Sequence, residues 1–138
     1  MKTSTLIDTN ILIDLFGSGQ IQASSADLLE QAMRDGPIVL SAIVWAEFAT
    51  PGISEEQLWR KLQWLKPKRE DFPFEAAYSA GLAHRTYKAR GGTREKTLPD
   101  FLIGAHALVA GHRLLTCDAR RYRTYFPDLD LIAPDTHP

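Results

Sequence analysis

Short runs of apolar residues alternate along this chain with longer segments in which apolar residues recur every three or four positions. The short runs predict buried strands at residues 3–7, 38–40, 113–116 and 129–132. The longer segments predict helices at residues 10–16, 24–34, 42–49, 54–65, 75–89, 99–110 and 119–125. Strands that alternate with helices indicate an α/β protein in which helices cover both faces of a parallel sheet.

Helix boundaries are marked by residues that suit helix ends. Ser41 is a suitable N-cap, and Ser54 with Gln57 forms a capping-box pattern. Pro99 occupies a first-turn position, and Gly111 is a suitable C-cap. In parallel sheets ligands bind beyond the carboxyl ends of the strands, so we expect any functional site at that edge.

Length and composition predict one soluble domain over residues 1–138. The chain is 44% hydrophobic and 24% charged, which is typical of globular proteins rather than disordered ones. Cys117 is the only cysteine, so an internal disulfide is excluded and a cytoplasmic location is expected. The apolar runs are too short to span a bilayer, so no membrane association is expected.

The charged residues that sum to a net charge of −1 are unevenly distributed along the chain. Residues 1–59 carry a net charge of −6, residues 60–125 carry +8, and the remaining residues carry −3. A basic region near an acidic pocket suits an enzyme that acts on a polyanion, although solvated helical faces also carry such charges.

Four acidic residues adjoin the predicted apolar elements. Asp8 follows the first strand, and Asp118 follows the strand at residues 113–116. Glu47 lies in the helix after the second strand, and Asp100 begins the helix of residues 99–110. A carboxylate beside buried surface costs several kcal/mol unless it is paired or bound to a cation. Because the strand ends meet at one edge, the four predict one acidic pocket for a divalent metal.

Such a pocket suits Mg²⁺, which prefers oxygen ligands. A bound cation can activate water for attack on phosphorus, and a second can stabilise the leaving oxygen. No phosphate-binding loop, nucleophile elbow, Cys-x-x-Cys pair or His-x-x-x-His spacing competes with this interpretation. Taken singly, Asp100 at a helix start and Asp118 as an N-cap have structural interpretations. His106 is interpreted as a partly buried helix residue, Cys117 as a small buried residue and Asp14 as an exposed helix acid.

Four segments carry a more specific signal. They are residues 6–14 (LIDTNILID), residues 46–48 (AEF), residues 99–107 (PDFLIGAHA) and residues 114–118 (LLTCD), the last followed by Tyr122 and residues 131–134 (LIAP). Together and in this order, they resemble the motifs of PIN-domain ribonucleases, in particular the VapC toxins of toxin–antitoxin pairs. The resemblance spans nearly the whole chain. It departs at Arg121, where many relatives carry a further polar or acidic residue.

The resemblance implies a PIN-like three-layer sandwich with a central parallel sheet of about five strands flanked by helices. It implies an endoribonuclease dependent on Mg²⁺ or Mn²⁺, which hydrolyses RNA phosphodiester bonds with metal-activated water. It also implies a homodimer held inactive by a small VapB-like antitoxin, alone or in a larger toxin–antitoxin assembly. The implied site consists of four metal-binding and catalytic residues with two in support: Asp8, Glu47, Asp100 and Asp118, then Thr116 and Asn10.

Basic residues before Asp100 are candidates for contact with RNA phosphates: Arg85, Lys88, Arg90, Arg94 and Lys96. The helix that carries Trp59 and Trp64 is a candidate for a partner-binding groove. Two alternative functions stay open. A haloacid dehalogenase-type phosphatase also has an aspartate after its first strand, but its chemistry wants a second acid where this chain has Asn10. A catalytically silent RNA- or protein-binding module would gain nothing from clustered carboxylates.

Overall fold

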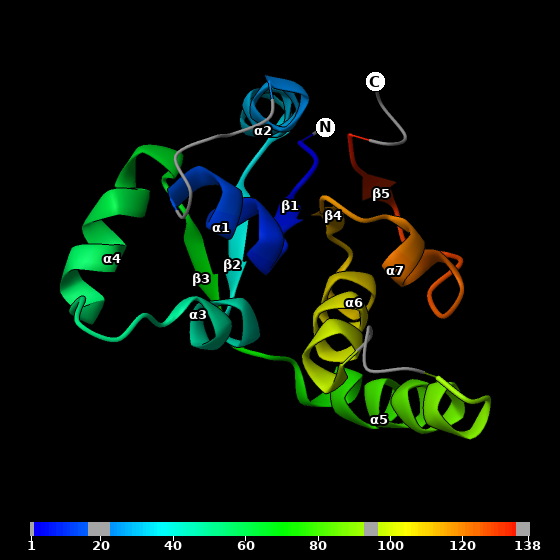
Figure 1. The fold of residues 1–138 in the computed structure, drawn as a ribbon. Coiled ribbons are helices and arrows are strands. Elements are labelled where there is room, and N and C mark those ends of the chain that lie inside the picture. Colours follow the sequence, from blue (N-terminus) through cyan, green and yellow to red (C-terminus); the bar gives the residue numbers. More distant parts are fainter. Residues whose placement is uncertain (1, 17–22, 93–96, 135–138) are drawn as a thin grey trace.

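A five-stranded parallel sheet is the centre of the computed structural model, which describes residues 2–16, 23–92 and 97–134 (Figure 1). The strand order is β3-β2-β1-β4-β5. The strands are β1 (Thr5–Ile7), β2 (Ile38–Ser41), β3 (Lys68–Glu70), β4 (Arg113–Leu115) and β5 (Leu131–Ile132). Leu6 pairs with Val39 on one side and with Leu114 on the other, which places β1 at the middle of the sheet.

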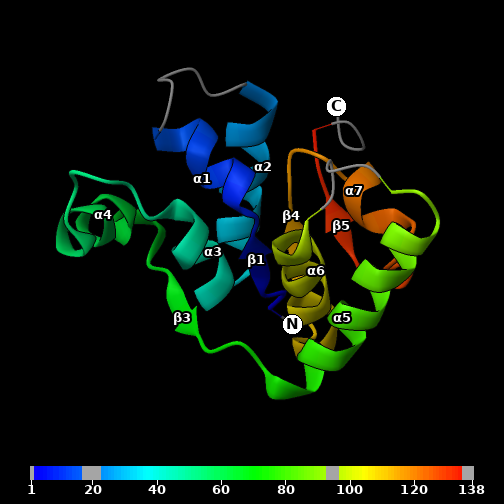
Figure 2. The same cartoon turned by 60° about the horizontal axis from the view of Figure 1, so that its bottom comes forward.

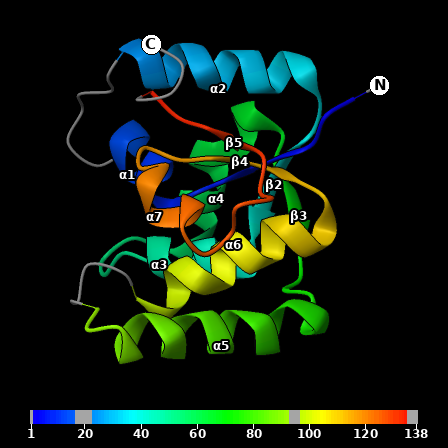
Figure 3. The ribbon, with the colours of Figure 1, turned by 90° about the vertical axis from the view of Figure 1, so that its right-hand side faces the viewer.

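The helices of the described residues lie on both sides of this sheet. They are α1 (Thr9–Phe16), α2 (Ala23–Asp35), α3 (Ala42–Phe48), α4 (Glu55–Leu62), α5 (Phe74–Ala89), α6 (Leu98–Ala110) and α7 (Arg120–Arg123). Figure 3 shows α2 on one side of the strands and α6 on the other. Helix α5 packs against the outside of α6, as Figure 2 also shows. The predicted three-layer α/β architecture is therefore confirmed.

Burial of the central strands explains why they form the middle layer. Every residue of β1 and β2 is buried, and so are Leu114 and Leu115 of β4. Strands covered on both faces require such continuous apolar runs. Within the described residues, no helix combines the length and apolar character needed to cross a bilayer.

Several predicted helix ends are confirmed. The Ser41 hydroxyl accepts a hydrogen bond from the Ile43 N–H at 3.2 Å, and Ser54 and Gln57 form a reciprocal capping box. Gly111 ends α6 at a φ of 76°, a left-handed conformation that glycine adopts without steric cost. The sequence therefore marks the starts of α3 and α4 and the end of α6 correctly.

Strand β3 was missed by the apolar pattern. Its residues are Lys68, Arg69 and Glu70, and it lies at the sheet edge, paired only with β2. Edge strands often carry charged side chains that discourage pairing with other chains, so no apolar run marked this one. The pattern alone gave four strands, and the expectation of about five from the resemblance was right. The last predicted helix is also shorter than expected, since α7 covers only residues 120–123.

Candidate active site

Asp8 lies directly after β1 and is 3% exposed. Its backbone N–H donates to the Leu115 carbonyl at 2.9 Å, which joins the ends of β1 and β4. Its Oδ1 accepts a hydrogen bond from the Thr9 N–H at 2.7 Å. Its Oδ2 accepts from the hydroxyls of Thr116 at 2.8 Å and Tyr122 at 2.7 Å. The carboxylate is therefore held in one orientation by three donors.

Burial raises the pKa of Asp8. The three hydrogen bonds lower it in part, and the neighbouring Asp100 raises it further. Burial and the Asp8 charge also raise the pKa of Tyr122, so its hydroxyl stays protonated as a donor. The charges of Asp8 and Asp100 therefore repel each other in this site. An ionised Asp8 is costly in this place unless a cation stabilises it.

Asp100 combines a structural contact with a place in the site. It lies in the first turn of α6 and is 8% exposed. Its Oδ2 accepts from the N–H and the hydroxyl of Thr97, at 2.9 and 3.2 Å. Its Oδ1 lies 3.3 Å from the Arg121 guanidinium. The helix-start interpretation thus accounts for only one of its two oxygens.

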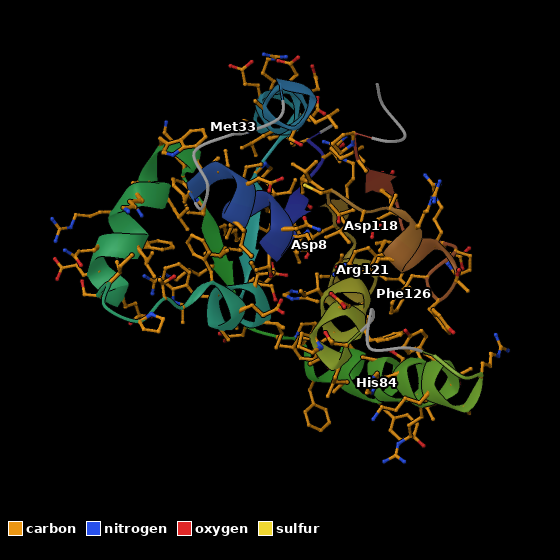
Figure 4. The ribbon with its side chains drawn as sticks, viewed as in Figure 1. Asp8, Met33, His84, Asp118, Arg121 and Phe126 are labelled. Carbon is orange, nitrogen blue, oxygen red and sulfur yellow. The ribbon has the colours of Figure 1, made fainter. Side chains whose placement is uncertain are left out.

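Asp118 and Arg121 extend the group beyond β4. Arg121 Nε lies 3.6 Å from Asp118 Oδ2, so one guanidinium contacts the carboxylates of both Asp118 and Asp100. Asp118 does not cap α7, because the N-cap is Ala119 and no side chain caps this helix. Figure 4 shows Asp8, Asp118 and Arg121 gathered where α1, α6 and α7 approach each other.

Glu47 reaches this group from α3. Its side chain is exposed, and its Oε1 accepts a hydrogen bond from the Thr9 hydroxyl at 2.7 Å. Thr9 also donates its backbone N–H to Asp8, so one residue contacts both carboxylates. The structure thus brings Asp8 and Asp100 together, links Asp118 through Arg121, and links Glu47 through Thr9.

Thr116 and Asn10 connect the segments of the site through hydrogen bonds. The Thr116 hydroxyl donates to Asp8 and accepts from the Asn10 amide at 3.2 Å and the Asp118 N–H at 3.1 Å. Asn10 Oδ1 accepts from the Cys117 N–H at 3.1 Å. Both residues thus join the segment after β4 to the start of α1.

Comparison with known proteins decides the family. The family model described as the PIN domain matches residues 5–127. The chain belongs to the PIN domain family. It is therefore not a member of the haloacid dehalogenase phosphatases, the alternative left open by its first aspartate.

Solved structures share the fold of this PIN domain. VapBC2 from Rickettsia felis, bound to a DNA fragment from its promoter, is 23% identical with a TM-score of 0.72, over 95% of this chain and 98% of that one. VapBC-1 from nontypeable Haemophilus influenzae is 22% identical with a TM-score of 0.72, over 96% and 99%. A toxin–antitoxin complex from Klebsiella pneumoniae is 25% identical with a TM-score of 0.65, over 94% and 97%. No curated protein matches the sequence.

Four residues in contact with the acids of this PIN domain were not assigned these roles from the sequence: Thr9, Thr97, Arg121 and Tyr122. Thr9 adjoins Asp8, and Tyr122 follows Asp118 by four residues, which are the available signals. The positions of Thr9 and Tyr122 in the sequence do not show that their side chains contact carboxylates. Besides the N-cap interpretation of Asp118, three interpretations were wrong. His106 is fully buried rather than partly buried. Cys117 is half-buried rather than buried, and burial raises the pKa of its thiol to about 12. Asp14 is half-buried and accepts from that thiol at 3.0 Å.

The described basic candidates lie at the end of α5, with Arg85 and Lys88 in its last turns and Arg90 at its C-cap. The described members are exposed: Arg85, Lys88 and Arg90. Arg94 and Lys96 lie outside the described residues. Tyr87 contacts Phe101 with ring centroids 5.8 Å apart, which holds the end of α5 against the first turn of α6. The basic end of α5 therefore lies at the same end of the domain as Asp100.

The acidic group fits a hard divalent cation. Its potential ligands are all carboxylate oxygens, the type that Mg²⁺ and Mn²⁺ prefer. The buried and mutually repelling Asp8 and Asp100 provide the physical reason for a cation there. Arg121 supplies positive charge to Asp100 and Asp118 but has no contact with Asp8 among the described hydrogen bonds and ion pairs.

Proposed function

We propose that this PIN domain is an endoribonuclease that requires Mg²⁺ or Mn²⁺ and hydrolyses RNA phosphodiester bonds. The observation that carries the proposal is the buried Asp8 carboxylate, held by three donors beside Asp100. The residues that would hold the cation are Asp8 and Asp100, with Glu47 and Asp118 in support. Bound there, the cation would supply an activated water and would stabilise negative charge at phosphorus.

The residues around the acids would hold the carboxylates in fixed orientations. The hydroxyls of Thr116 and Tyr122 fix the orientation of Asp8, and Thr9 holds Glu47 toward it. Such fixed groups need little rearrangement during the reaction, which is how preorganised sites lower a barrier. A catalytically silent binding module would have no need of this arrangement. The ordered acids therefore favour catalysis over that alternative.

We further propose that the domain acts in the cytoplasm as the VapC-type toxin of a toxin–antitoxin pair. The likeness to VapBC structures and to a toxin–antitoxin complex supports a small VapB-like partner. A groove of about 540 Å³ between α3 and α4 is the surface we assign to it. Its lining is largely apolar: Trp45, Ala46, Ala49, Thr50, Pro51, Ile53, Glu55 and Leu58. A short open reading frame overlapping or just upstream of this one would identify the partner.

A homodimer is the assembly we propose for the toxin. Helix α5 exposes an apolar stripe of Phe74, Tyr78 and Leu82, which are 89%, 78% and 50% exposed. The spacing of four residues places the three side chains on one face of the helix. A contiguous exposed apolar face is typical of an association surface. Packing of this face against a second copy of the chain would remove it from water. Two such dimers could join in a larger toxin–antitoxin assembly.

RNA cleavage by the purified chain tests the proposed activity. We expect cleavage with Mg²⁺ or Mn²⁺, and loss of cleavage with a chelator or in Asp8→Asn, which removes a ligand charge. Asp128→Asn is a matched control, because Asp128 is exposed and lies outside the site. Cleavage is measured on labelled RNA after repeated purification, with thermal unfolding as a check of folding. Undiminished cleavage by Asp8→Asn would contradict the mechanism, and a folded wild-type chain inactive with either cation would favour a silent module.

A further inference from the structure

A second group of metal-binding side chains lies apart from the acidic site. Glu70 ends β3, His106 lies in the middle of α6, and His112 lies between α6 and β4. The Nε2 atoms of the two imidazoles lie 2.9 and 2.7 Å from the same Glu70 Oε1. The three donor atoms all lie within 4.8 Å of one another. His106 is six residues beyond Asp100, which corresponds to about 9 Å along the α6 axis.

Each imidazole ring contacts a different serine hydroxyl through its Nδ1 atom. His106 Nδ1 lies 2.9 Å from Ser41 Oγ, and His112 Nδ1 lies 2.6 Å from Ser4 Oγ. Each Nε2 lies at hydrogen-bond distance from the Glu70 carboxylate, so it carries the proton there and Nδ1 accepts from the serine hydroxyl. A cation at Nε2 would require the other tautomer, in which Nδ1 carries the proton and the serine oxygen accepts it. Histidines that bind metals have their other ring nitrogen fixed in the same way.

The protonation states of His106 and Glu70 also suit a metal. Burial lowers the pKa of His106, and the Glu70 charge offsets this only in part, so the imidazole is neutral near pH 7. Burial alone would raise the pKa of Glu70, but hydrogen bonds from the two histidines outweigh it and lower the pKa. A neutral imidazole and an ionised carboxylate are the forms that bind metals. The Glu70 side chain is 27% exposed, which gives a cation access from solvent.

We propose that Glu70, His106 and His112 bind one zinc-type transition-metal ion, with the remaining coordination position open to water. Two imidazoles and one carboxylate form a donor set that Zn²⁺ uses in proteins. Mg²⁺ prefers oxygen ligands, so the trio and the acidic site select different cations. The ligands come from β3, α6 and the turn before β4. The ion would therefore fasten the edge strand, which otherwise pairs only with β2, to the helix that covers the sheet.

Cobalt is the probe for this site, because Co²⁺ replaces Zn²⁺ and absorbs visible light when bound by nitrogen ligands. The full-length chain is titrated with Co²⁺ in excess Mg²⁺, which keeps the acidic site occupied. We expect one equivalent to bind with a visible absorption band and to raise the melting temperature. His112→Gln and Glu70→Gln are expected to bind Co²⁺ at least about tenfold more weakly and to lose the band and the stabilisation.

His84→Gln is the matched control, since His84 lies on α5 against Phe101 and belongs to neither site (Figure 4). It is expected to keep the wild-type band. Glu70→Gln retains an oxygen that can accept hydrogen bonds, so it tests the ligand with the least disturbance of the fold. Absence of a band at one equivalent in the wild-type chain would overturn the proposal. An equal band in Glu70→Gln and His112→Gln would also overturn it, and the trio would then be a hydrogen-bonded carboxylate only.

Discussion

At the scale of single residues, Arg121 places a positive charge beside two carboxylates of the acidic site. Its guanidinium contacts both Asp100 and Asp118, and its side chain is 34% exposed. The neighbouring carboxylates raise the pKa of Arg121 against the effect of burial, so it is always charged. A fixed positive charge between two ligand candidates competes with a divalent cation for the same oxygens.

Replacement of Arg121 by glutamine should therefore tighten metal binding. A partly exposed ion pair contributes up to about 1 kcal/mol, so we expect the half-saturating Mg²⁺ concentration for RNA cleavage to fall about fivefold. The measurement is a Mg²⁺ titration of the cleavage rate. Arg120→Gln is the matched control, because it removes the same charge from an exposed neighbour that forms no ion pair among the described residues. Equal shifts in the two variants would show that only the overall charge matters.

Residue types and spacing predict the acidic site better than they predict its supporting contacts. Each of the four acids adjoins a recognisable apolar element, and parallel topology brings those elements to one edge. The contact of Tyr122 with Asp8 depends on the direction of a short helix, which the sequence does not indicate. The same limit applies to His106 and His112. Both contact Glu70, which comes from β3, and β3 has no apolar pattern.

At the scale of elements, the packing of α6 against the segment after β4 depends on Gly104. A methyl group at this position would lie 2.7 Å from the Phe126 ring and 3.1 Å from the Tyr122 ring. Both rings are buried, so neither moves without disturbing the core. Since Tyr122 donates to Asp8, this close approach connects helix packing to the orientation of a site carboxylate.

Gly104→Ala should consequently lower both stability and metal affinity. Overpacking costs about 1–3 kcal/mol, and the better helix propensity of alanine returns about 1 kcal/mol. A net loss of about 1 kcal/mol would lower the melting temperature by about 3–5 °C. Thermal unfolding and a Mg²⁺ titration of cleavage measure the two effects. Gly81→Ala on α5 is the control, because its methyl group would meet no atom within 4 Å. It should be neutral or stabilising, and similar behaviour of the two variants would contradict the packing argument.

At the scale of the whole molecule, the fold determines where the basic part of the sequence lies relative to the acidic site. The basic end of α5 and the start of α6, which carries Asp100, lie together because Tyr87 packs on Phe101. A polyanion drawn to Lys88 and Arg90 would therefore arrive beside the acidic site. In the proposed function, the favourable charge of this surface would offset the repulsion between RNA phosphates and the carboxylates.

The salt dependence of RNA binding tests this orientation. Each phosphate contact contributes about 0.7 to the slope of log K against log salt for a single strand, so Lys88→Glu with Arg90→Glu should flatten the slope by at least about 1.4. Binding is measured in the Asp8→Asn background, where RNA stays intact. The control pair is Lys61→Glu with Lys68→Glu, since Lys61 is exposed on α4 and Lys68 is exposed at the start of β3, and neither lies on α5. If both pairs flatten the slope equally, attraction is a property of net charge alone. An unchanged slope in the α5 pair would remove this helix from the RNA-binding surface.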